Sequence, residues 1–184
     1  MSRLILITGG ARSGKSDFAE QLAHSLGRDD VLFVATAEAL DEDMARRIAA
    51  HRQSRPPAWC TLETPRHVGT AIQNAAAARV VIVDCLTLLV SNVLFAEEGS
   101  PDPNAAETAV SAEVCDLIAA ARAVRGDLIV VTNEVGLGIV PDNRLARTYR
   151  DLLGRANSTL AREADQVYLM VAGLPLEIKA LTRR

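Results

Sequence analysis

Residues 5–16 read Ile-Leu-Ile-Thr-Gly-Gly-Ala-Arg-Ser-Gly-Lys-Ser, and residues 9–16 match G-x-x-x-x-G-K-S at every fixed position. This pattern is typical of a phosphate-binding loop between a buried strand and a helix. Its glycines let the backbone wrap around a phosphate chain, so that successive N–H groups face the anion. An apolar run precedes the loop and a helical apolar period follows it over residues 15–26. We therefore expect nucleotide binding and set aside an ordinary glycine-rich turn.

The loop assigns expected roles to individual residues. Those predicted to bind the triphosphate are Gly9, Gly10, Ala11, Arg12, Ser13, Gly14, Lys15 and Ser16. Within this set, Lys15 is expected to reach the β- and γ-phosphates and Ser16 to bind Mg²⁺ through its hydroxyl. Asp84 is the candidate second Mg²⁺ ligand, because it ends an apolar run in a chain that already has a phosphate loop. The alternative is a carboxylate that only caps the next helix.

Composition limits the remaining functions. With 184 residues, 49% of them hydrophobic, the chain is expected to form one domain over residues 1–184. The net charge of −3 gives no general reason to bind nucleic acid or a membrane surface. The amino-terminal segment runs directly into the phosphate loop, so we expect neither a signal peptide nor a membrane span, and a cytoplasmic location. The three widely spaced cysteines predict no disulfide or zinc site, only small buried or half-buried thiols.

Apolar β-rich runs alternate with helical ones along the chain. Strands are expected at 4–7, 30–35, 59–63, 79–84, 127–132 and 166–171, and helices at 15–26, 41–55, 71–78, 86–95, 105–124 and 143–164. Asp41 is the expected cap of the helix over 41–55, and Asp142 or Asn143 is the expected cap of the last helix. Residues 97–104 are expected to form a loop, Gly126 to end the preceding helix, and residues 176–180 to form an antiparallel edge strand. The order predicts a P-loop NTPase-like α/β fold, with a mostly parallel central sheet flanked by helices. Polar residues at the strand exits should therefore meet at one edge of the sheet. They are the loop over residues 9–16, Thr36 to Glu38, Asp84 and Asn133-Glu134.

His51 lies three positions after Ile48 and seven after Met44, so it continues an apolar stripe of the helix over residues 41–55. A lone histidine there is more often a packed core residue. Arg52 and Arg55 follow it, however, and an imidazole among guanidinium groups suits a phosphate better than a core. Positive neighbours favour the neutral ring that a nucleophile needs, and they stabilise charge on an attacked phosphoryl group. The arginines alone are equally compatible with a solvated helix face.

Over essentially its whole length the sequence resembles the bifunctional adenosylcobinamide kinase/adenosylcobinamide-phosphate guanylyltransferases of cobalamin biosynthesis. The segments that carry the resemblance are 8–16, Ala35-Thr36-Ala37, Arg47-Ile48 with His51-Arg52, Arg55-Pro56, 59–63, 132–141 and 143–147. The phosphate loop is shared by very many proteins. The segment with His51 and the loop over residues 133–141 are far more specific.

The resemblance implies two reactions. A kinase step transfers the γ-phosphate of ATP or GTP to adenosylcobinamide, and a guanylyltransferase step passes GMP from GTP through a histidine matching His51 to adenosylcobinamide phosphate. It also implies Mg²⁺ at Ser16 and Asp84, and a homotrimer. The residues that it places around the guanine nucleotide are Ala35, Thr36, Ala37, Arg52, Gln53, Ser54, Arg55, Glu63 and Asp84.

Two other functions stay open at this stage. The chain is also compatible with a monofunctional small-molecule P-loop kinase in which His51 is structural, or with a nucleotide-dependent switch or binding protein. Guanine selectivity is not derivable, because the N-K-x-D element of GTP-binding switches is absent. The kinase step mainly needs positioning and charge stabilisation, and Glu134 is a conceivable general base, although a loop-ordering role is favoured.

Overall fold

The structure, a computed structural model, describes residues 2–39, 42–96 and 102–182. Its strands are β1 Leu4–Gly9, β2 Val31–Ala35, β3 Cys60–Glu63, β4 Val80–Asp84, β5 Asp127–Val131, β6 Gln166–Val171 and β7 Leu174–Glu177. Its helices are α1 Lys15–Gly27, α2 Glu42–Ser54, α3 Val68–Asn74, α4 Leu86–Leu94, α5 Pro103–Ala123, α6 Arg144–Glu163 and α7 Ile178–Thr182. The side chains of residues 43, 47, 50, 54 and 182 are outside this description. None of the described helices is long and apolar enough to cross a membrane.

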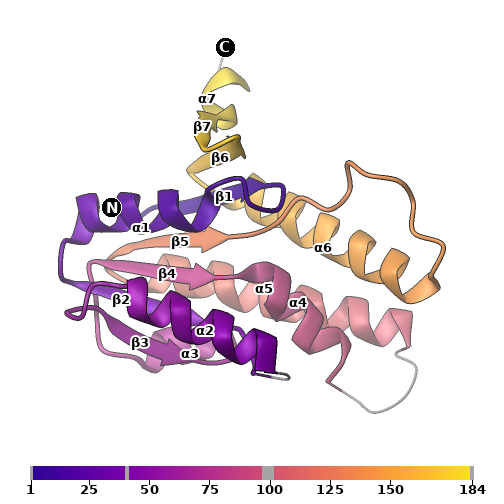
Figure 1. Cartoon of the computed structure of the whole chain (residues 1–184), viewed down its shortest axis with the longest axis horizontal. Helices are drawn as coiled ribbons and strands as arrows, with labels where there is room; N and C mark the ends of the chain where they lie inside the picture. Colours follow the sequence, from indigo (N-terminus) through magenta and orange to yellow (C-terminus); the bar gives the residue numbers. More distant parts are fainter. Residues whose placement is uncertain (1, 40–41, 97–101, 183–184) are drawn as a thin grey trace.

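One sheet in the order β3-β2-β4-β5-β1-β6-β7 organises the molecule (Figure 1). All neighbouring strands pair in parallel except β6 and β7, which are antiparallel. β1 lies between β5 and β6, so the phosphate loop leaves from the interior of the sheet. The predicted α/β fold is confirmed, and the carboxyl ends of β1, β2, β4 and β5 share one edge.

Helices bury both faces of the sheet. Ile5 and Ile7 of β1 belong to an apolar cluster with Ala19 of α1, whereas Leu4 and Leu6 belong to the cluster formed with α3 to α6. Figure 1 shows α1 and α2 in front of the sheet and α5 behind it. Alternate residues therefore enter opposite cores, and each large apolar side chain contributes roughly 2 kcal/mol by burial.

Helix α3 starts and ends earlier than the predicted 71–78. The side chain of Glu113, on α5, accepts hydrogen bonds from the backbone N–H of His67 (2.7 Å) and of Val68 (3.4 Å). This remote carboxylate caps the helix, which then ends at Asn74 because Ala75 is extended. The local sequence carries no sign of a cap supplied from α5.

The ends of α5 also differ from the prediction. Asp102 caps the helix through bonds to the N–H of Asn104 (3.2 Å) and Ala105 (3.4 Å), so α5 starts at Pro103, within the predicted loop. Residues 97–101 of that loop lie outside the described residues. Gly126 does not end the helix, which stops at Ala123; it is needed instead for close packing, since an added Cβ would lie 2.3 Å from the Ala78 carbonyl oxygen.

The caps of the other two long helices can be compared with the sequence. Asp41, the predicted cap of α2, lies outside the described residues. For α6 the cap is Asn143, whose side chain accepts from the N–H of Leu145 at 2.7 Å. The cysteine prediction is wrong for Cys60 and Cys115, which are exposed, and right for the half-buried Cys85.

The carboxyl-terminal hairpin supports the phosphate loop. The predicted antiparallel strand exists, but it starts earlier, at Leu174, and passes into α7 at Ile178. In the turn before it, the N–H of Gly173 donates to the carbonyl oxygen of Ser13 at 3.1 Å. A Cβ on Gly14 would lie 3.2 Å from the Gly173 Cα, so the two glycines allow the turn to pack directly on the loop.

Candidate functional site

The phosphate loop is held in a closed conformation by a hydrogen bond from its own lysine, Lys15. Gly9 and Gly14 have φ of 149° and 88°, values that side-chain-bearing residues rarely adopt. A Cβ at Gly9 would lie only 2.6 Å from the Met170 carbonyl oxygen of the neighbouring strand β6. The ammonium of Lys15 donates to the Gly10 carbonyl oxygen at 2.6 Å, and burial lowers the pKa of Lys15. A phosphate oxygen would replace that carbonyl as a stronger, charged partner.

Ser16 and Asp84 bring two oxygen donors together beside the loop. The Ser16 hydroxyl lies 3.5 Å from Oδ2 of Asp84, at the end of β4. Burial raises the pKa of the Asp84 carboxyl, although His51, Arg55, Ser16 and Lys15 act in the opposite direction. A divalent cation would offset this desolvation, and hydroxyl and carboxylate oxygens are ligands that Mg²⁺ prefers. The pair therefore fits the predicted metal site.

A pocket of about 410 Å³ opens at this edge of the sheet, and we call it the phosphate-loop pocket. The predicted site residues that line it are Ala11, Arg12, Lys15, Ser16, Ala35, Ala37, His51, Arg55 and Asp84. Met44 and Ile48 of the predicted helical stripe and Asn133 of the predicted polar strand exit also line it. The remaining lining residues, to which the sequence assigned no site role, are Cys85, Thr87, Leu88, Val131 and Thr132. Residues from β2, β4, β5, α1, α2 and α4 thus meet at one cavity, as the strand exits predicted.

His51 enters the pocket from α2. Its side chain is exposed, and Met44 and Ile48 line the same pocket, so the stripe predicted from the helical spacing faces the cavity. Arg55 follows just after the helix, with its guanidinium carbon 3.5 Å from the centroid of the Phe33 ring. Burial lowers the pKa of Arg55, and its Nε has no hydrogen-bond partner in the described part of the chain. Such a desolvated guanidinium is well suited to bind a phosphate.

Other predicted nucleotide residues lie around the pocket. Gly9, Gly10, Ser13 and Gly14 shape the loop without lining the cavity. Thr36 is fully buried; its hydroxyl donates to the Cys85 carbonyl oxygen and accepts from the Cys85 N–H, both at 2.8 Å. Thr36 therefore ties the exits of β2 and β4 together.

Three predicted residues lie at the rim of the molecule. Arg52 and Glu63 form an ion pair of 3.4 Å between side chains that are 67% and 60% exposed. Gln53 is also exposed, and the side chain of Ser54 is outside the described atoms. The high exposure means that these residues contact a nucleotide only if it extends beyond the pocket toward β3.

A hydrogen-bond network fixes the exit of β5. The Asn133 N–H donates to Oγ1 of Thr87 (2.8 Å), and the carboxamide nitrogen of Asn157 donates to the Asn133 carbonyl oxygen (3.0 Å). The Thr132 hydroxyl donates to Oδ1 of Asn157 (2.7 Å). The sequence placed Asn133 among the polar strand exits expected to converge here, and Asn133 lines the pocket. It assigned no role to Thr87, which follows the strand exit within α4.

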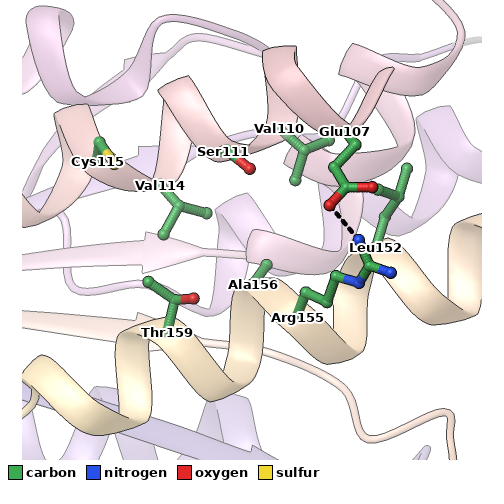
Figure 2. Close-up of a pocket in the computed structure, with 9 residues that line it drawn as sticks. All are labelled: Glu107, Val110, Ser111, Val114, Cys115, Leu152, Arg155, Ala156 and Thr159. Atoms are coloured by element: carbon green, nitrogen blue, oxygen red, sulfur yellow. Dashed lines mark hydrogen bonds and ion pairs between the residues drawn. The ribbon is translucent and has the colours of Figure 1, made fainter. Parts of the chain in front are cut away.

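A second, smaller pocket lies between α5 and α6 (Figure 2). The side chains of Val110, Val114 and Leu152 line its interior, and an ion pair between Glu107 and Arg155 closes one end of it. It is an apolar gap between packed helices, and its two charged groups neutralise each other. The chemistry of the molecule therefore points to the phosphate-loop pocket.

Known proteins resemble this chain over nearly its whole length. The model of the family described as cobinamide kinase / cobinamide phosphate guanyltransferase matches residues 5–178. The chain is 46% identical to the bifunctional adenosylcobalamin biosynthesis protein CobU of Salmonella typhimurium, over 96% of this chain and 99% of that protein. It is 42% identical to the bifunctional adenosylcobalamin biosynthesis protein CobP of Pseudomonas aeruginosa, over 95% and 96% of the two chains.

Solved structures support the fold. The flagellar accessory protein FlaH from Methanocaldococcus jannaschii superposes with a TM-score of 0.50 and 18% identity, covering 91% of this chain and 70% of that one. The RadB recombinase gives a TM-score of 0.50 and 13% identity, covering 91% and 73% of the two chains. At these identities the likeness concerns the P-loop fold alone.

Proposed function

The chain belongs to the cobinamide kinase / cobinamide phosphate guanyltransferase family, and from that premise we propose that it catalyses both reactions in one pocket. In the first it phosphorylates adenosylcobinamide with ATP or GTP. In the second it transfers GMP from GTP to adenosylcobinamide phosphate. The observation that carries the proposal is that His51, Lys15, Ser16 and Asp84 line the same cavity.

In the kinase step, the terminal hydroxyl oxygen of adenosylcobinamide forms a bond to the γ-phosphorus. The bond from that phosphorus to the β,γ-bridging oxygen breaks, the nucleoside diphosphate leaves, and the hydroxyl proton passes to solvent. Lys15 and the loop N–H groups would neutralise the phosphate oxygens during transfer. Ser16 and Asp84 would hold Mg²⁺, which supplies further neutralisation of the triphosphate when bound.

In the guanylyl step, a ring nitrogen of His51 forms a bond to the α-phosphorus of GTP, and pyrophosphate leaves. A phosphate oxygen of adenosylcobinamide phosphate then displaces the histidine, giving adenosylcobinamide-GDP and restoring the imidazole. The covalent route splits one displacement into two easier ones. The half-buried guanidinium of Arg55, held on the Phe33 ring, would stabilise charge on the attacked phosphoryl group.

The remaining parts of the proposal come from the family resemblance. Ala35 at the end of β2, with Thr36 and Ala37 directly after it, would position the guanine nucleotide. Arg52, Gln53, Ser54 and Glu63 would contact its outer part. We also propose that the protein works as a homotrimer in the cytoplasm, with no nucleic acid partner. Light scattering at micromolar concentration tests the trimer directly.

Mass spectrometry after incubation with GTP and Mg²⁺ tests the function as a whole. We expect a GMP-sized addition on the peptide that contains His51, and its disappearance when adenosylcobinamide phosphate is added. A monofunctional kinase would phosphorylate adenosylcobinamide without forming that adduct. A nucleotide-dependent switch would hydrolyse nucleotide and leave the corrinoid unchanged.

A further inference from the structure

Asn133 lies between the phosphate loop that follows β1 and Asp84 at the end of β4. It follows β5, which pairs on one side with β4, so that Val131 is in register with Asp84. On the other side, the Thr132 N–H donates to the Ile7 carbonyl oxygen (2.9 Å), and the Glu134 N–H donates to that of Gly9 (3.0 Å). The pairing with β1 therefore continues to the first residue of the phosphate loop, and Asn133 lies between that loop and Asp84.

The backbone of Asn133 is held from both sides, but its side chain is not. Thr87 accepts its N–H and Asn157 donates to its carbonyl oxygen. No residue that the structure describes makes a hydrogen bond to its carboxamide, and Asn133 is one of the residues that line the phosphate-loop pocket. The neighbouring side chains are occupied: Thr132 donates to Asn157, and Glu134 accepts from the Gly136 N–H at 2.6 Å. A fixed backbone with an unpaired amide is a preorganised arrangement for binding a ligand.

We propose that Asn133 is a substrate-contacting residue of the kinase step, with its carboxamide N–H donating to a non-bridging oxygen of the terminal phosphate of the bound triphosphate. The inference rests on the proposed function. An amide provides two donors without adding charge, so it stabilises the phosphoryl group without competing with Asp84 for a cation. Its place at the β5 exit, beside the loop, assigns it to the γ-phosphate, whereas His51 approaches from α2.

Binding measurements distinguish a contact with the terminal phosphate from an effect on the binding of every nucleotide. ADP lacks the group that Asn133 contacts, while the β,γ-imido analogue of ATP retains it. For Asn133→Ala we expect the affinity for the imido analogue to fall by about tenfold or more and the affinity for ADP to stay unchanged. Asn133→Asp should weaken the imido analogue further, because its carboxylate repels the phosphate. Asn74→Ala, an exposed asparagine at the end of α3, is the matched control.

Turnover gives the second readout. With adenosylcobinamide and ATP, Asn133→Ala should lower kcat by about 100-fold, as for loss of a donor to a transition-state oxygen. At saturating GTP its His51 adduct should reach the wild-type extent. Its melting temperature should match the wild-type value, since no internal hydrogen bond is lost.

The outcomes that overturn the inference are distinct from failure of the proposed function. Equal losses for ADP and the imido analogue, unchanged kinase turnover, or a lowered melting temperature would each show that Asn133 does not contact the terminal phosphate. If the wild-type protein itself fails to phosphorylate adenosylcobinamide, the proposed function is wrong. The comparison of ADP with the imido analogue still decides the role of Asn133 in that case.

Discussion

The Ser16 hydroxyl lies 3.5 Å from Oδ2 of Asp84, although the two residues are 68 positions apart in the chain. Ser16 is fixed because it follows Lys15 at the start of α1, and Asp84 because it ends β4, which pairs with β5. Two independent backbone constraints therefore point two oxygen donors at one place. This relationship gives the clearest prediction about metal dependence.

Asp84→Asn keeps the shape of the side chain and removes its charge. We expect the Mg²⁺ concentration for half-maximal kinase activity to rise by about tenfold or more, because an amide oxygen binds Mg²⁺ less tightly than a carboxylate. A titration of initial rate with Mg²⁺ measures this. Asp17→Asn, an exposed change on α1, is the control. An unchanged Mg²⁺ requirement would show that Asp84 does not bind the metal.

His51→Ala should abolish the GMP adduct and guanylyl transfer while leaving phosphorylation of adenosylcobinamide measurable. The physical reason is that the kinase step uses the loop and the metal pair, whereas only guanylyl transfer requires a covalent bond to the imidazole. Radiolabel from α-³²P GTP retained on the protein gives the readout. His24→Ala, on the exposed side of α1, should label normally. Labelling of His51→Ala itself would exclude this histidine as the nucleophile.

Arg3 and Asp127 predict how stability depends on pH. Burial raises the pKa of the Asp127 carboxyl, but its hydrogen bonds from Arg3 and the Arg3 charge outweigh this, so the net pKa lies below its ordinary value. The pair is 2.5 Å apart, with side chains 40% and 15% exposed. A lowered folded-state pKa stabilises the fold above the unfolded-state pKa of about 3.9, and this stabilisation is lost as pH falls through the folded value.

Asp127→Asn should therefore cost about 1 kcal/mol of unfolding free energy at pH 7, a value already reduced for the exposure of Arg3. Urea denaturation at pH 7 and near the acid limit of the folded state measures it. The difference from wild type should shrink toward the acid limit. Asp29→Asn, exposed in the turn after α1, should show no such trend. A difference that stays constant with pH would mean that packing, and not charge, is responsible.

Gly69 lets α3 pack directly on α5. A Cβ there would lie 2.4 Å from the backbone carbon and oxygen of Asp116, so Gly69→Ala must displace the helix and should cost about 1–3 kcal/mol. Gly154 is the matched control, because it lies inside α6 with nothing within 4 Å of an added Cβ. Gly154→Ala should stabilise by up to about 1 kcal/mol through helix propensity. Thermal and urea unfolding of both variants decide the comparison, and equal effects would contradict a close α3–α5 contact at Gly69.

The sequence predicted the features that depend on local periodicity. The buried strands, the phosphate loop and the α2 face that carries Met44, Ile48 and His51 all follow from spacing along the chain. The structure adds what remote residues supply: the cap of α3 by Glu113 and the anchoring of Asn133 by Asn157. No local pattern distinguishes a glutamate that caps a distant helix from one in solvent. For the same reason, the stacking of Arg55 on Phe33 was not predictable.

The turn at Gly173, which supports the phosphate loop at Ser13, has a consequence for synthesis. Because the chain is synthesised from its amino terminus, the phosphate loop leaves the ribosome early. β6 and this turn emerge about 150 residues later. Until then the phosphate loop lacks its contacts with β6 and with the turn at Gly173. A nascent chain should therefore be unable to capture nucleotide, and the competence to bind arises only as the last strands leave the exit tunnel.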